Sequence, residues 1–175
     1  KRGRPLGGEC FSTAYTGLRF SETRCINGLS TDKPEAFAGI SSPKLLFIVD
    51  EASGVDEAIF QAIFGNMAGG ATIVLISNPT RTSGTFYDSH HGKRNLWHTL
   101  SMDSREGPNF RGKEVPGLAT PEWVEWAKEN WGEQSPMFSV RVKGEFPTQG
   151  ENNVIGLDLV ESAVARGEML GETDP

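Results

Sequence analysis

Two adjacent carboxylates, Asp50 and Glu51, follow directly on the apolar run at residues 45–49, LLFIV. One carboxylate at the end of a strand can hold Mg²⁺, which prefers a few protein oxygens together with water and phosphate. A second carboxylate beside it can position and polarise an attacking water molecule. The pair therefore indicates metal-assisted hydrolysis, and the alternative is a strand that simply ends in two solvated acids.

An apolar run followed by Asp-Glu is the Walker B pattern of nucleotide hydrolases. A second polar group, Ser77-Asn78, stands at the end of the next apolar run, residues 71–77. These side chains can hydrogen-bond a terminal phosphate or the attacking water, and so report hydrolysis. Pro79 fixes the chain as it leaves the strand, and Gly84 allows a tight turn in the following loop. Taken alone, this stretch is also consistent with an ordinary turn.

A strand, a helix and a second strand must position these side chains. Residues 45–49 and 71–77 are almost entirely apolar, and residues 56–68 place apolar side chains at helical spacing. Strands that are apolar on both faces are typical of parallel sheets covered by helices, so the sequence predicts an α/β unit. A right-handed crossover brings both strand C-termini to one edge of the sheet, where ligands bind in open α/β folds. Asp50-Glu51 and Ser77-Asn78 are therefore expected to converge.

The remaining elements are predicted from turn and capping signals. Residues 10–28 contain β-favouring residues broken by Gly and Asn, as in hairpins, and residues 32–40 contain one short helical turn. Residues 96–102 are predicted to form a further strand. Start and stop signals predict three helices, at 121–131, 136–143 and 157–166.

Four stretches of the chain occur in an order that is more specific than any single motif. They are INGLSTDKPEAFAGI at 26–40, KLLFIVDEASGVDEAIFQAIFGNMAGGATIVLISNPTRTSGTFYDSH at 44–90, WGEQSPMFSVRVKGEFP at 131–147, and NNVIGLDLVESAVAR at 152–166. The second stretch resembles the ATPase domain of large terminase subunits, the motors that package DNA into viral procapsids. The others resemble the flanking segments of that domain and the helix between motor and nuclease.

The resemblance implies a RecA-like P-loop ATPase fold followed by a helical linker. Asp50 would then bind Mg²⁺, Glu51 would be the catalytic base, and Asn78, with Ser77 and Thr80, would form the motif that couples ATP hydrolysis to DNA movement. Residues 1–147 would be the C-terminal portion of the motor domain, and residues 148–175 a linker toward a nuclease domain. The implied cofactors of the full-length protein are ATP and Mg²⁺, and weak or no binding is expected for this chain by itself.

For the full-length protein, the implied partners are double-stranded DNA, the portal protein, the small terminase subunit and further copies in a ring. No membrane partner is expected, and the expected compartment is the cytoplasm of an infected bacterium or of a prophage carrier.

Two departures from the family pattern qualify this expectation. The sequence contains no G-x-x-x-x-G-K-[ST] phosphate loop, since Gly92-Lys93 and Gly112-Lys113 have the wrong neighbours. In the family this Walker A loop precedes Walker B, so it would fall before Lys1, and the chain alone is expected to show little or no ATPase activity. Large terminase subunits also carry a C-terminal nuclease with a cluster of metal-binding acids, and Asp158 could be the first of these. The residues after Asp158 have a helical pattern, so it is interpreted as a helix-start acid, and no complete nuclease site is expected in this chain.

Other residues that could carry chemistry have simpler interpretations. The three histidines lack metal-ligand spacing and are expected in a surface loop, and the tryptophans of residues 121–131 are expected to pack in the core rather than stack on bases. Arg81 could sense phosphate or a neighbouring subunit, or be a solvated arginine. The residues concerned are His90, His91, His98, Trp123, Trp126 and Trp131.

Composition sets the outer limits. The 175 residues, with 37% hydrophobic residues, suit one α/β or α+β domain, and the formal charge of −6 argues against a nucleic-acid surface over the whole molecule. Lys1, Arg2 and Arg4 form only a short basic cluster, and Cys10 and Cys25 are expected to be reduced. The missing initial Met suggests an excised piece. Two other functions stay open: a helicase-like or recombination ATPase, and a binding or assembly module without ATPase activity.

Overall fold

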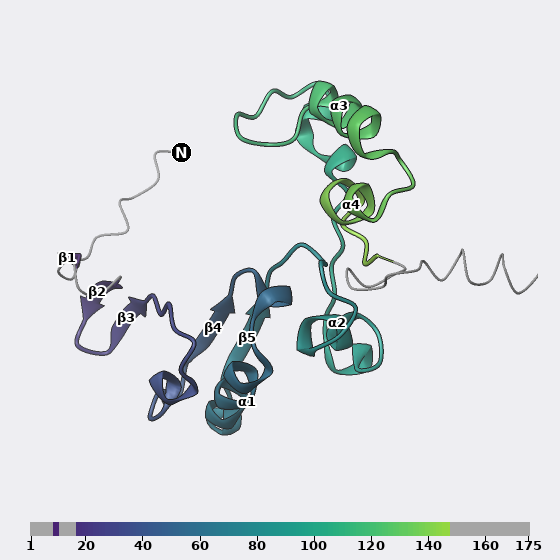
Figure 1. Cartoon of the computed structure of the whole chain (residues 1–175). Coiled ribbons are helices and arrows are strands. Elements are labelled where there is room, and N and C mark those ends of the chain that lie inside the picture. Colours follow the sequence, from purple (N-terminus) through teal and green to yellow (C-terminus); the bar gives the residue numbers. More distant parts are fainter. Residues whose placement is uncertain (1–8, 11–16, 148–175) are drawn as a thin grey trace, which may run out of the picture.

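A computed structural model describes residues 9–10 and 17–147 of the chain. The basic cluster at Lys1, Arg2 and Arg4, the acid Asp158 and the linker 148–175 lie outside the described residues, so their interpretations stay predictions. The strands are β1 (Glu9–Cys10), β2 (Gly17–Ser21), β3 (Arg24–Asn27), β4 (Leu46–Val49) and β5 (Thr72–Leu75). The helices are α1 (Glu57–Gly65), α2 (Thr85–His90), α3 (Pro121–Trp131) and α4 (Pro136–Phe138) (Figure 1).

The first sheet is antiparallel and contains the predicted hairpin. Strand β2 pairs with β3, with Leu18 opposite Ile26, and β1 pairs with the other side of β2. After the hairpin, residues Pro34–Phe37 form the expected helical turn, and Phe37 is buried against α1. The free thiol of Cys25 is exposed, whereas the side chain of Cys10 is not described.

The second sheet consists of β4 and β5, which are parallel, with Val49 opposite Leu75. Helix α1 connects them, and Figure 1 shows it beside the two strands. Asp56 caps the start of α1 by accepting a hydrogen bond from the N–H of Ala58 at 2.8 Å. The predicted strand–helix–strand unit is therefore confirmed, and the chain is of mixed α/β class.

Only one face of this parallel sheet is covered within the described residues. Phe47, Val49, Ile73 and Leu75 pack against the buried side chains of α1 and its neighbours. The other face carries Leu46 (54% exposed), Ile48 (63%) and Val74 (40%), followed by Ile76 (50%). The expectation that both faces are buried is wrong for this part of the chain, because α1 and the turn before β4 lie on the same side.

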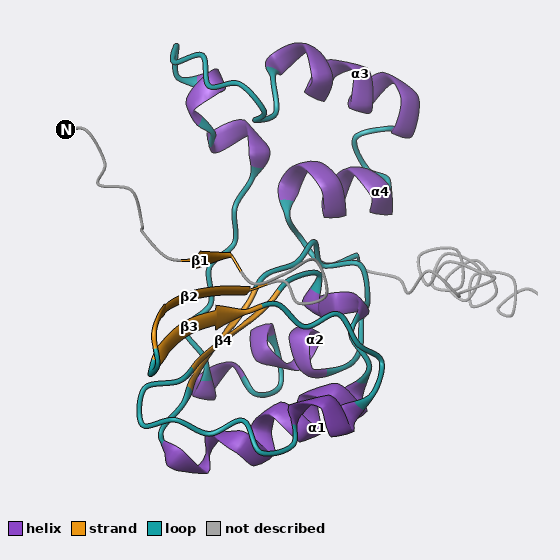
Figure 2. Ribbon diagram, turned by 90° about the vertical axis from the view of Figure 1, so that its left-hand side faces the viewer, coloured by secondary structure: helices purple, strands orange, loops and turns teal. Residues whose placement is uncertain are grey.

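A separate helical unit is built from α3 and α4, and both views show it apart from the β4–β5 sheet (Figure 2). Thr120 and Ser135 cap the two helices, and α4 continues into a π-helical turn at Ser139–Lys143 that ends at Gly144. The core of the unit consists of Val124, Ala127, Phe138 and Val142. The predicted helices at 121–131 and 136–143 are confirmed, except that the second is only partly α-helical.

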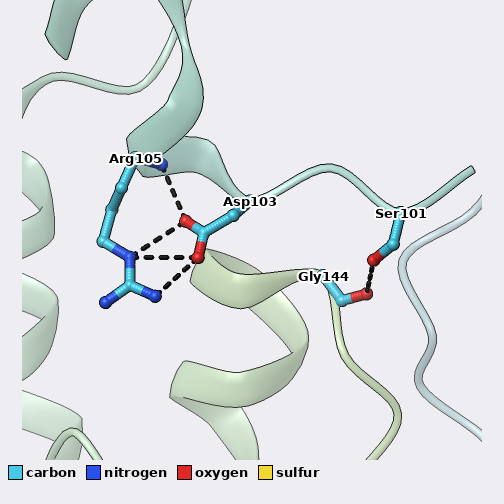
Figure 3. Close-up of polar contacts among 4 residues, drawn as sticks. All are labelled: Ser101, Asp103, Arg105 and Gly144. Atoms are coloured by element: carbon cyan, nitrogen blue, oxygen red, sulfur yellow. Dashed lines mark hydrogen bonds and ion pairs between the residues drawn. The ribbon is translucent and has the colours of Figure 1, made fainter.

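Residues 96–102, predicted to be a strand, are irregular except for Leu96, which is the last residue of the 3₁₀ turn Arg94–Leu96. A strand needs a neighbour for its backbone groups, and no described strand lies beside this segment. Instead the Ser101 hydroxyl donates to the carbonyl of Gly144 at 3.1 Å (Figure 3). Nearby, Asp103 and Arg105 form an ion pair in which Nε donates to both carboxylate oxygens, at 2.9 and 3.1 Å.

Candidate functional site

The acidic tip, Asp50 and Glu51, lies where β4 ends, beside the end of β5. The parallel pairing continues past the strands, because the N–H of Ile76 donates to the carbonyl of Val49 at 2.9 Å. The N–H of Ala52 then donates to the carbonyl of Ile76 at 3.1 Å. The chain thus turns at the acidic tip while remaining bonded to the end of β5, so the predicted convergence of the two polar tips is confirmed in its backbone.

Glu51 makes this turn in a left-handed conformation, with φ 52° and ψ 36°, and it is the one non-glycine residue with positive φ among residues described. Such a conformation costs an L residue with a side chain about 1–2 kcal/mol. The 3₁₀ turn Ala52–Gly54 follows, closed by a 2.8 Å bond from the N–H of Gly54 to the carbonyl of Glu51. Backbone strain of this kind is concentrated at functional sites, which makes Glu51 a candidate on geometry as well as on type.

Both acids of the tip are exposed. One carboxylate oxygen of Asp50, Oδ1, accepts the N–H of Glu51 at 2.9 Å, which orients the Asp50 side chain at the strand end. Two exposed neighbouring carboxylates suit Mg²⁺, which keeps most of its water ligands and takes few from the protein. Within the described ranges no cluster of three or more His, Cys, Asp or Glu residues could hold a metal by itself.

The segment Ser77–Arg81, which contains the residues predicted to couple hydrolysis to movement, is bonded to the turn behind the acids. Ser77 Oγ accepts the N–H of Ser53 at 3.0 Å and donates to the carbonyl of Asn78 at 2.8 Å. Thr80 Oγ1 donates to Ser53 Oγ at 3.1 Å. Asn78 is exposed, while Pro79 is buried.

Ser53 is a site residue that the sequence interpretation missed. It is 6% exposed, and its hydroxyl also accepts the N–H of Arg81 at 3.0 Å. A serine two positions after the acids is the only signal that the sequence offers, because its partners are 27 and 28 residues away along the chain.

Glu57 holds the next part of the loop. Its Oε1 accepts the N–H of Thr85 at 2.6 Å, and its Oε2 accepts the Thr85 hydroxyl at 2.8 Å. Gly84, with φ 92°, makes the predicted tight turn directly before this contact. An open hollow of about 280 Å³ lies here, lined by Ala52, Ser53, Val55, Asp56, Glu57, Arg81, Ser83, Gly84, Thr85 and Phe86. Arg81 and Ser53 therefore line the same hollow. Whether Arg81 senses phosphate or a neighbouring subunit, or is a solvated arginine, stays open.

His90 and His91 contact neighbouring rings and backbone carbonyls. His90 is the last residue of α2, so the expected surface loop is wrong for it, and Nδ1 of His91 bonds to the Tyr87 carbonyl at 2.9 Å. Both imidazoles lie against the ring of Phe146, with centroids 5.3 and 5.0 Å away.

Among the tryptophans, Trp123 and Trp131 pack on the core of the helical unit, as expected. Trp126 is 49% exposed and packs edge-on against Trp131, so the core interpretation is wrong for its outer surface. No helix in the described part of the chain is long and apolar enough to cross a bilayer.

Comparison with known proteins gives one informative match. Over 140 residues, 75% of this chain, the sequence is 36% identical to the protein named "Probable terminase, large subunit" of Enterobacteria phage P7. The aligned region is 27% of the length of that relative, so this chain spans about a quarter of it. No family model matches the chain, and no solved structure matches it.

Proposed function

From the homology of this chain to part of a large terminase subunit, we propose that it belongs to an ATP-driven motor that moves double-stranded DNA into a viral procapsid. The homology favours this function over a helicase-like ATPase or a binding module. A RecA-like P-loop fold, ATP with Mg²⁺, and a ring of copies that engages a portal protein and a small subunit are parts of the same proposal. So is the cytoplasm of an infected bacterium or prophage carrier as its location.

The observation that carries the proposal is the arrangement of the two polar tips. Asp50 and Glu51 follow the end of β4, and Ser77 and Asn78 follow the end of the neighbouring strand β5. Backbone and side-chain hydrogen bonds join the two segments. The carboxyl ends of parallel strands are the part of an α/β sheet where ligands bind. A Mg²⁺-bound phosphate group placed at Asp50 would therefore lie near both Glu51 and Asn78.

Each residue has a distinct role in the proposed reaction. Asp50 would hold Mg²⁺, and the ion would neutralise charge on the phosphates when it is bound. Glu51 orients the attacking water and accepts its proton. Asn78 and Thr80 sense the terminal phosphate and transmit its loss. The sequence of this chain supplies no Gly-Lys-[ST] loop, so the phosphate-binding loop of the active motor is not among these residues.

The test uses a chimaera in which this chain replaces the homologous part of the phage P7 subunit. We expect the chimaera to hydrolyse ATP and Glu51→Gln to lower kcat about 100-fold or more, because the amide cannot accept the proton. Gln61, an exposed residue of α1 remote from the tip in sequence, provides a matched control as Gln61→Glu. Equal turnover of the unaltered chimaera and its Glu51→Gln variant would show that another group is the base.

A second measurement uses the chain by itself. We expect it to hydrolyse little or no ATP, and any turnover that disappears in Glu51→Gln would contradict that expectation. Mn²⁺, as a paramagnetic substitute for Mg²⁺, is expected to broaden the backbone NMR signals around residue 50. That broadening should be lost in Asp50→Asn, and its persistence would place the metal elsewhere.

A further inference from the structure

The buried hydroxyl of Ser53 joins two segments that are distant in sequence. Ser53 is two positions after Glu51, within the 3₁₀ turn Ala52–Gly54, and is 6% exposed. Its Oγ accepts hydrogen bonds from Thr80 Oγ1 at 3.1 Å and from the N–H of Arg81 at 3.0 Å. Removing a buried hydroxyl with two partners is costly, because its loss leaves an N–H without an acceptor.

The same turn is bonded to the segment at two further points. The N–H of Ser53 donates to Ser77 Oγ, and the N–H of Ala52 donates to the carbonyl of Ile76. Residues 52–53 therefore contact residues 76, 77, 80 and 81, on both sides of the exposed Asn78. Asn78 is held at both ends of its loop while its own side chain remains exposed.

We propose that Ser53 is a positioning residue that fixes segment Ser77–Arg81 relative to Asp50 and Glu51. Through this hydroxyl, a displacement of the acidic tip changes the position of Thr80 and Arg81, and the reverse also holds. The structural part of this proposal, that Ser53 fixes the position of the segment, rests only on the hydrogen bonds of residues 52–53 described above. The functional consequence, that Ser53 links hydrolysis to movement of the segment, rests on the function proposed above.

Amide hydrogen exchange in this chain tests the structural part. In Ser53→Ala the Arg81 N–H loses its acceptor, so its exchange is expected to accelerate about five- to tenfold, the equivalent of one hydrogen bond. Ser53→Thr keeps the hydroxyl and should restore the wild-type rate to within about twofold. Unchanged exchange at Arg81 in Ser53→Ala would overturn the proposal.

Ser89 gives a matched control. It is a second buried serine, 2% exposed, and its hydroxyl donates to the Phe86 carbonyl within its own helix at 2.7 Å. Ser89→Ala should leave Arg81 exchange unchanged, and exchange at the Phe60 N–H reports any loss of global stability.

If Ser53→Ala does not fold, Thr80→Val removes one of the two hydrogen bonds to Ser53 Oγ from a less buried position. Arg81 exchange should then accelerate about threefold, and no change would contradict the proposal.

Kinetics of the chimaera test the functional part. Because Ser53 positions residues rather than contacting nucleotide, Ser53→Ala should lower kcat about tenfold or more with KM for ATP unchanged, and Ser53→Thr should restore kcat. A changed KM with normal kcat would contradict the positioning role.

If Glu51→Gln is inactive and Ser53→Ala is fully active, the motor function stands and the Ser53 link fails. If Glu51→Gln is fully active, the proposed function fails, whereas the exchange result still decides the hydrogen-bonded link.

Discussion

Gly144 lies so close to Met102 that a Cβ atom built on the glycine would be 2.5 Å from the Met102 carbonyl oxygen. Gly144 also has φ 64°, and it ends the helical unit at the point where the Ser101 hydroxyl bonds its carbonyl. Two segments that enter and leave the helical unit therefore meet at a residue without a side chain. The obstructing atom belongs to the backbone, so it cannot move aside cheaply.

Gly144→Ala is therefore expected to destabilise the chain by about 2–4 kcal/mol, from the clash and the left-handed backbone together. Gly70→Ala is the matched control, because Gly70 has a left-handed backbone like that of Gly144, with φ 88° and ψ 25°, but no atom within 4 Å of a built Cβ. That variant should cost only the backbone term, about 1–2 kcal/mol. Urea denaturation measures both, and equal losses would show that the close approach to Met102 contributes nothing.

The two faces of the β4–β5 sheet predict different costs for the same substitution. Ile73 packs on the α1 side among Phe37, Ile59 and Ile63, whereas Ile48 is 63% exposed. Ile73→Ala is expected to cost about 2 kcal/mol and Ile48→Ala less than about 1 kcal/mol, since little apolar area leaves water at Ile48. Thermal and urea unfolding of the chain compare them directly. A larger loss at Ile48 would mean that something covers the outer face in solution.

Much of this α/β unit follows from the sequence. Apolar runs at 45–49 and 71–77 with a helical pattern between them predict two parallel strands, and parallel strands bring Asp50 and Ser77 to one edge. The pattern cannot say whether a strand is covered on both faces, because Ile48 and Ile73 are the same residue type in different surroundings. From the apolar runs alone, both faces of the sheet are predicted to be buried, whereas the outer face is exposed among the described residues.

Contacts between distant residues are the part that the sequence does not predict. Ser53 is an ordinary serine until the fold brings Thr80 and Arg81 to its hydroxyl. Residues 96–102 have the composition of a strand, yet they lack a neighbouring strand among the described residues and bond to Gly144 instead. In both cases the outcome depends on tertiary partners, which local propensity does not contain.

The ion pair of Asp103 and Arg105 predicts a specific acid dependence of stability. The hydrogen bonds from Arg105 hold the pKa of Asp103 below its usual value. A carboxyl whose pKa is lowered by folding stabilises the protein at pH values above its unfolded pKa of about 3.9, and this contribution is lost as pH falls through the lowered value. Asp103→Asn should therefore reduce stability at neutral pH and make it less sensitive to acid below about pH 4.

Urea unfolding of both proteins between about pH 2 and 7 measures this difference. The control is Asp32→Asn, because Asp32 is an exposed acid outside the ion pair. Parallel stability curves for wild type and Asp103→Asn across this range would show that the pair contributes no pH-dependent stability.

Glu51 provides the sharpest test of strain at the acidic tip. At an ordinary strand or helix position, Gly is less stable than Ala by about 0.5–1 kcal/mol. At φ 52° the order should reverse, because Ala retains the left-handed penalty and Gly does not. Glu51→Gly is therefore expected to be more stable than Glu51→Ala by about 1 kcal/mol, and both lack the carboxylate. Comparing these two variants by urea denaturation isolates the backbone conformation from the loss of charge.

The sign of that difference also bears on why a glutamate stands at this position. If Gly is the more stable residue, the sequence retains a strained glutamate where a simpler residue would fold better, as expected of a side chain kept for its chemistry. If Ala is the more stable residue, Glu51 is not strained, and the case for it as the catalytic base rests on its position beside Asp50 alone.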